Sequence, residues 1–151
     1  RDHIIVDDSA RADRISVADA VDRERVESFL TATDFDAETV YIEMGAVQEC
    51  FRLKLCRIGW SSTEVSTDYT QQARPYTAHC EVREAVIEAR LIRIPDPINA
   101  DDVTSYSSSI GTGVCDRQHT RAEGESGTGP STPSETPTRT ATTTGDSGGE
   151  Q

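Results

Sequence analysis

Four cysteines, Cys50, Cys56, Cys80 and Cys115, lie in the only part of the chain whose residue pattern is typical of strands. The segment that follows them offers almost nothing to a core, because 21 of the 28 residues from Gly124 to Gln151 are Gly, Pro, Thr or Ser. Such a segment cannot offset the entropy cost of its own ordering. We therefore predict one small disulfide-stapled core followed by a disordered tail.

The 151 residues divide into three predicted parts. Residues 1–20 mix charged and small residues without a sustained period, so we expect an N-terminal arm, extended or forming a weak first element. Residues 21–117 carry the periodic segments and should form the disulfide-stapled, β-rich domain. Residues 118–151 are the disordered tail rich in Ser, Thr, Pro and Gly.

One helix is expected near the start of the domain, over about residues 22–32. Asp22 can cap its N-terminus, and Val26, Phe29 and Leu30 fall on one helical face. After it the period falls toward two, which predicts strands at about 38–44, 50–60, 65–69 and 80–94, with a last short strand within 105–115. Gly45 is expected as a bulge or turn, and Pro95 should end the long strand.

These elements predict a mainly β (α+β) fold. Five or six strands and one helix, without a regular βαβ alternation, favour a small antiparallel sheet or sandwich.

The strand over 50–60 restricts the disulfide pairing. Six residues of extended chain place Cys50 and Cys56 about 20 Å apart, whereas a disulfide requires Cα atoms within about 7 Å. Two pairings remain. Antiparallel pairing of the two long strands would bring Cys56 toward Cys80, so we favour Cys56–Cys80 with Cys50–Cys115. The alternative is Cys50–Cys80 with Cys56–Cys115.

Composition excludes several classes of function. The formal charge is −12, and 14 of the 15 basic residues are Arg scattered among acidic residues, which argues against nucleic-acid binding. No stretch approaches the roughly 20 apolar residues of a membrane helix. The first residue is Arg1 and not Met, as expected of a cleaved precursor or of a chosen boundary. The four cysteines and the Ser/Thr/Pro/Gly-rich tail together predict an extracellular or cell-surface location.

Candidate chemistry is weak. His79 adjoins Cys80 and His119 follows Cys115 by four residues, which leaves a zinc or copper site as the alternative hypothesis, but no close C-x₂-C pair supports it. No serine lies in a G-x-S-x-G turn and there is no redox C-x-x-C. We therefore assign no catalytic residue, no cofactor and no metal ligand, and we predict a protein that is not an enzyme.

Several stretches carry a resemblance, namely ECFRLKLCRIGW, RPYTAHC, ARLIRIP and SYSSSIGTGVC. Together with the acidic, Lys-poor composition, they resemble a group of uncharacterised exported or cell-surface proteins of halophilic archaea. The resemblance covers about residues 25–116 and implies no established activity. The cysteines and the tail, and not the resemblance, predict a non-enzymatic structural or binding domain on a flexible stalk that is a candidate for O-linked sugars. Its partner would be a component of the cell envelope or another protein of unknown identity.

Overall fold

The computed structural model describes residues 2–75, 79–115 and 138–143. In chain order its elements are β1 (Asp2–Val6), α1 (Ser9–Asp13), α2 (Arg23–Thr31), β2 (Thr39–Gln48), β3 (Phe51–Trp60), β4 (Glu64–Ala73), β5 (Ala85–Ile94), the 3₁₀ turn η1 (Ala100–Asp102), β6 (Ser105–Thr112) and β7 (Thr138–Thr143). The described part is mainly β with few helical residues, as predicted.

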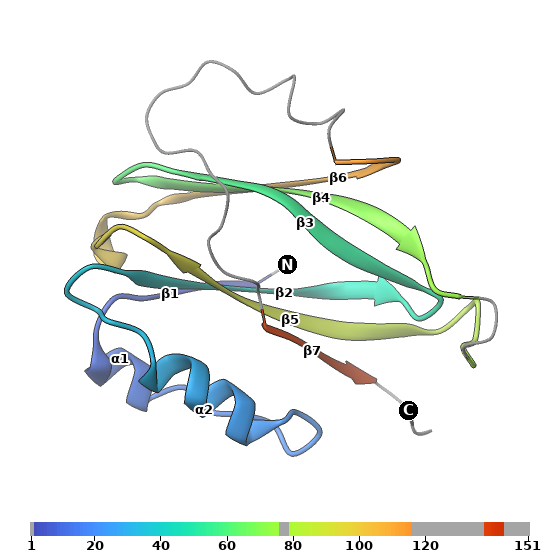
Figure 1. The fold of residues 1–151 in the computed structure, drawn as a ribbon, viewed down its shortest axis with the longest axis horizontal. Helices are drawn as coiled ribbons and strands as arrows, with labels where there is room; N and C mark the ends of the chain where they lie inside the picture. The colour runs from blue at the N-terminus through green and yellow to red at the C-terminus, as the bar shows by residue number, and fades with distance from the viewer. Residues whose placement is uncertain (1, 76–78, 116–137, 144–151) are drawn as a thin grey trace.

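The strands form two sheets that pack face to face (Figure 1). Sheet A has the order β1-β2-β5-β7 and sheet B the order β3-β4-β6. All neighbours are antiparallel except β4 and β6, which run parallel because the chain passes through β5 in sheet A between them. The predicted sandwich is confirmed, but one of its strand pairs is not antiparallel.

The outer face of sheet A is covered by α1 and α2 (Figure 1). The predicted helix is present, and Asp22 Oδ1 accepts a hydrogen bond from Arg25 N at 3.1 Å as its N-cap. An apolar cluster joins this helix to the sheet and contains the buried residues Val6, Val26, Leu30, Val40, Ile42 and Leu91. Burial of one helical stripe therefore fixes α2 against β2 and β5.

The inner face of sheet A meets sheet B through two further apolar clusters. One contains the buried residues Ile5, Tyr41, Ile58, Val65, Ile92, Ile94, Ile98 and Val103. The other, smaller cluster contains Val47, Leu53, Tyr69 and Val86. β2 consequently has buried residues on both faces at its N-terminal end, as a strand between a helix layer and a second sheet must.

Several predicted boundaries need correction. Residues 2–6 form β1, which pairs with β2, so of the two alternatives for the N-terminal segment a first element is present in place of an extended arm. Gly45 neither ends a strand nor forms a bulge, because it continues the β2–β5 ladder opposite Glu88. The long strand begins at Ala85 and not at residue 80.

The predicted tail, residues 118–151, lies outside the described residues except for β7. This strand pairs antiparallel with β5 and forms an edge of sheet A.

Candidate functional site

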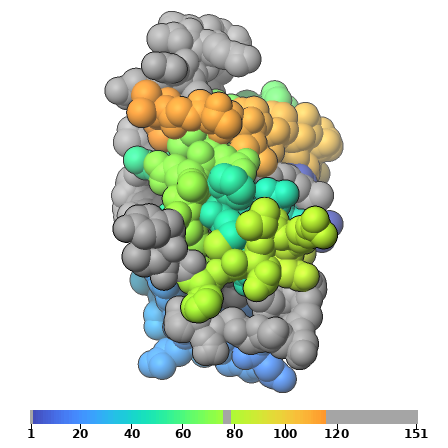
Figure 2. All heavy atoms as spheres, turned by 90° about the vertical axis from the view of Figure 1, so that its right-hand side faces the viewer, coloured from blue at the N-terminus to red at the C-terminus, as the bar shows by residue number. Residues whose placement is uncertain are grey.

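The first disulfide joins two connections between the sheets at one end of the sandwich. Cys50 lies in the turn from β2 to β3, and Cys80 lies in the chain that leads from β4 to β5. Their Cα atoms are 5.3 Å apart. Glu49 N also donates to Glu84 O at 2.9 Å, which holds the two connections together beside the bond. Figure 2 shows this end, where the teal residues around the β2–β3 turn lie next to the yellow-green chain that leads into β5.

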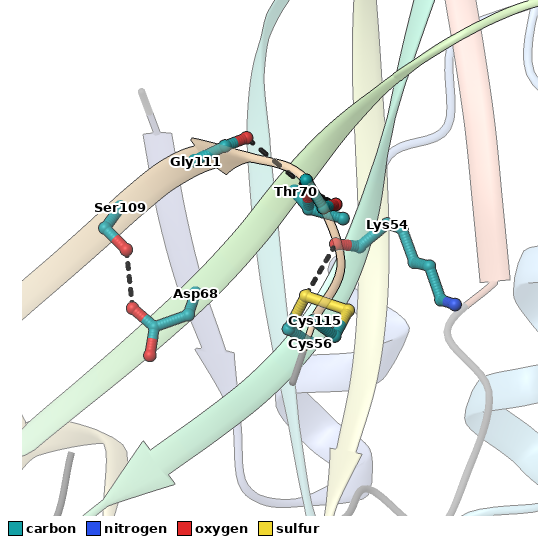
Figure 3. The surroundings of a disulfide bond; sticks show 8 residues. Lys54, Cys56, Asp68, Thr70, Ser109, Gly111 and Cys115 are labelled. Carbon is teal, nitrogen blue, oxygen red and sulfur yellow. Dashed lines mark hydrogen bonds between the residues drawn. A yellow bond between two sulfur atoms is a disulfide. The ribbon is translucent and has the colours of Figure 1, made fainter. Parts of the chain in front are cut away.

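The second disulfide, Cys56–Cys115, crosses the outer face of sheet B (Figure 3). The β3–β4 register shifts between Leu55 and Arg57, so Cys56 is the extra residue of a bulge. After β6 the chain turns back at Gly113, whose φ of 105° favours glycine. Gly113 O accepts a hydrogen bond from Thr70 Oγ1 at 2.7 Å, and Cys115 then reaches Cys56 with a Cα separation of 5.2 Å.

The favoured pairing was therefore wrong, and the alternative, Cys50–Cys80 with Cys56–Cys115, is present. The error came from the assumption that the two long strands are neighbours. β3 pairs with β4, while β5 pairs with β2 in the other sheet. The exclusion of a Cys50–Cys56 bond agrees with the structure, because all four cysteines are used in these two bonds.

A second candidate site lies between the sheets, where polar side chains interrupt the apolar clusters. His3, Glu43 and Arg90 are register partners in one row across β1, β2 and β5. The Glu43 side chain is 1% exposed. Its carboxylate accepts hydrogen bonds from the Tyr69 hydroxyl and, at 3.2 Å, from Thr67 Oγ1, both on β4. This carboxylate therefore links the two sheets directly.

His3 lies at the partly exposed side of this polar row. Its Nδ1 is 2.7 Å from Tyr41 Oη and 3.8 Å from Glu43 Oε1. Its ring stacks on Tyr106 of β6 with the centroids 4.7 Å apart and the planes 3° apart. Tyr106 thereby connects the edge strand of sheet B to the first strand of sheet A.

Arg90 and Glu88 occupy the other side of the row. Arg90 Nη2 donates to Glu88 Oε1 at 3.0 Å, and it also donates to the Leu53 carbonyl of sheet B. The Arg90 guanidinium carbon lies 4.9 Å from the centroid of the Tyr69 ring. The side chains of Arg90 and Glu88 are only 5% and 4% exposed, so this is a buried ion pair. Breaking such a pair costs more than breaking one at the surface.

The buried tyrosines of this region stay protonated. Burial raises the pKa of Tyr69 and Tyr41, and the nearby charge of Glu43 raises each pKa further. Protonated hydroxyls can donate to a carboxylate, as Tyr69 does to Glu43. The arrangement therefore provides hydrogen bonds between the sheets, and it does not present Glu43 to solvent as an acid or base.

The histidines considered as metal ligands do not form a site in the described part of the chain. His79 is exposed next to Cys80, whose sulfur is in a disulfide. His119 lies outside the described residues. Within 2–75, 79–115 and 138–143, no group of three or more His, Cys, Asp or Glu side chains is placed to hold a metal ion.

Sequence reasoning missed His3, Glu43 and Arg90 as interacting residues. One signal was available: Glu88 and Arg90 share the parity of Val86, Ile92 and Ile94 along β5. Two opposite charges within an otherwise apolar face indicate a buried pair. His3 gave no comparable signal, because its strand is short and its partners lie far away in the sequence.

Comparison with known proteins does not assign a family. No family model matches the sequence, and no curated protein or solved structure is significantly similar to it. None of the helices in the described residues is long and apolar enough to cross a membrane.

Proposed function

We propose that this chain is an exported, non-enzymatic structural or binding domain that is displayed outside the cell or at its surface on a C-terminal stalk. The observation that carries the proposal is the oxidation of all four cysteines into two disulfides. Disulfides form and persist in oxidising compartments and are rare in the cytosol.

The position of the second disulfide supports a stalk. Cys115 is the last described residue before the Ser/Thr/Pro/Gly-rich segment, and it is bonded to Cys56 in β3. A pull from the tail that detached β7 from β5 would reach the domain next at Cys115 and would pass through the covalent bond into β3. Without the bond the same pull would act on β6, which within the described residues is an edge strand paired with β4.

The polar row supports a role that does not involve catalysis. Its hydroxyl groups, carboxylates and guanidinium group contact one another and the backbone between two packed sheets. Buried polar networks of this kind favour one alignment of the packed layers.

The composition of the chain supports a high-salt environment and a glycosylated stalk. A formal charge of −12 with a single Lys fits a surface that holds water in concentrated salt, as in the halophilic proteins that the sequence resembles. The Ser and Thr residues of the tail are candidate acceptors for O-linked sugars. The partner is a component of the cell envelope or another protein.

The proposal is tested by treating intact cells that produce the full precursor with a protease that cannot enter them. We expect the chain to be digested from outside, to run without free thiols, and to carry added hexose mass on peptides from residues 124–151. A chain that is protected in intact cells and recovered with reduced cysteines would contradict the proposal. If the tail peptides carry no added mass, only the part of the proposal that concerns O-linked sugars is wrong.

A further inference from the structure

The tail contributes a strand to the folded domain. β7 pairs antiparallel with β5, from Thr138 opposite Leu91 to Thr143 opposite Val86, and so completes an edge of sheet A (Figure 1). Without β7, the backbone hydrogen-bonding groups along this edge of β5 would be unpaired. Val86, Leu91, Ile92 and Ile94 make β5 strongly apolar, and Ile87 remains 37% exposed. An open edge on an apolar strand is a template for pairing with another chain.

The sequence explains why this part of the tail becomes a strand. Residues 138–144 form the longest stretch without Gly or Pro between Gly124 and Gln151, and five of these seven residues are Thr. Thr is a β-branched residue that favours strands. Pro137 and Gly145 bound the stretch. The tail therefore contains one short segment of strand-forming sequence within a segment of linker composition.

No disulfide joins β7 to the rest of the domain. Both disulfides lie at or before Cys115, and 22 residues separate Cys115 from Thr138. Twenty-two residues of chain can span at most about 70 Å. A strand ladder consists of backbone hydrogen bonds, so the same segment of another copy can form the same ladder.

We propose that the outer edge of β5 is a strand-acceptor site, and that its partner is the 138–143 segment of a second copy of this chain. Two copies would then associate by exchanging their β7 strands. This self-association goes beyond the proposed function, in which the chain is a domain displayed at the cell surface. A strand tethered through 22 residues has an effective concentration of about 1 mM at its own edge, so exchange requires a comparable local concentration of other copies. Two bodies of charge −12 also repel each other, and salt screens this repulsion.

The acceptor site is tested with the full-length chain carrying Thr140→Pro and Ala141→Pro. Proline cannot donate to a ladder, and of two adjacent strand residues one directs its N–H toward β5, so the double change releases β7. A labelled peptide of residues 136–145 should bind this variant saturably. It should bind the unmodified chain about tenfold more weakly or worse, because the chain's own strand competes. The same peptide with both prolines is the matched control and should not bind.

Two outcomes of the peptide experiment would overturn the acceptor site. One is no binding to the double-proline chain, although that chain retains both disulfides and its far-ultraviolet strand signal. The other is equal affinity for both chains, which would place the peptide elsewhere on the surface.

Exchange between copies is tested by sedimentation of the unmodified chain up to about 1 mM. We expect a dimer whose fraction rises with concentration and with NaCl up to about 2 M, because salt shortens the screening length. The double-proline chain should be monomeric alone but should form a one-to-one complex with the unmodified chain. A monomer under all these conditions, or a dimer that persists in the double-proline chain alone, would overturn the proposal.

Discussion

The two sheets of the sandwich are stabilised in different ways. Sheet A is covered on both faces, by the helices outside and by sheet B inside, and the first five residues of β2 are all buried. Among the described residues, sheet B is covered mainly on its inner face, and Arg52 and Lys54 of β3 are exposed on its outer face. Its outer face buries Thr70 where the chain from Gly113 to Cys115 crosses it. Apolar burial therefore holds sheet A, whereas sheet B depends more on cross-links.

Those cross-links are of two kinds. The disulfide Cys56–Cys115 fixes β6 to β3 by a bond that skips the strand between them. Glu43 and Arg90 reach from sheet A to hydrogen-bonding groups of sheet B. A half-covered sheet buries less apolar area, so each covalent or charged link contributes a larger share of its stability.

The largest expected effect is the loss of the buried guanidinium. Arg90→Ala removes the ion pair with Glu88 and the hydrogen bond to the Leu53 carbonyl, and should lower the free energy of unfolding by about 3–5 kcal/mol. Urea unfolding measures this change. Arg52→Ala on the exposed face of β3 is the matched control and should change stability by less than about 0.5 kcal/mol. Equal effects at the two positions would show that the row does not join the sheets.

The next prediction distinguishes the two sheets by their response to the loss of one disulfide. The double change Cys56→Ser and Cys115→Ser should cost about 2–4 kcal/mol. Hydrogen exchange should accelerate at the amides of β6 (Ser105–Thr112) and much less at those of β2, because the removed bond anchors the edge of sheet B. Unchanged exchange in β6, or an equal loss of protection in β2, would remove the distinction between the sheets.

A pH effect follows from the buried tyrosines at the junction of the sheets. Burial raises the pKa of Tyr41 and Tyr69 in the folded state, so their contribution is complete below the ordinary pKa of about 10 and is lost as the pH rises above it. Above that pKa, the difference in proton binding between the folded and unfolded states should lower the free energy of unfolding by up to about 1.4 kcal/mol per pH unit for each tyrosine. Tyr69→Phe should make the decline between pH of about 9 and about 11 shallower. An unchanged slope would contradict the assignment.

The smallest effect belongs to the helix side of sheet A. Asp22→Ala removes the N-cap of α2 and should cost about 1 kcal/mol, without altering hydrogen exchange in β6. Asp36→Ala, at an exposed position, is the control and should be close to neutral. Faster hydrogen exchange at the β6 amides in Asp22→Ala would show that the two sheets unfold together, as a single unit.

Local elements could be predicted from the sequence, because local chemistry specifies them. Asp22 followed by Val26 and Leu30 is sufficient to place α2. The alternation of Val65, Thr67 and Tyr69 predicts a strand over 65–69 and so places β4, where all three side chains are buried.

The assignment of strands to sheets could not be predicted. β2 and β3 are joined by a tight turn, as the strands of a hairpin are, yet they belong to different sheets. Consecutive strands usually pair, and nothing local in Glu49 or Cys50 indicates otherwise. The pairing of the cysteines depends on this partition. So does the row of His3, Glu43 and Arg90, whose members come from three separate strands.

The central claim is that this chain is a sandwich held together in an oxidising compartment by two specific disulfides. Proteolysis of the denatured, unreduced and alkylated protein, followed by mass spectrometry, tests it most directly. We expect no alkylated cysteine, one cross-linked peptide pair containing Cys50 with Cys80, and another containing Cys56 with Cys115. Four alkylated cysteines, or cross-links between Cys56 and Cys80, would contradict the account.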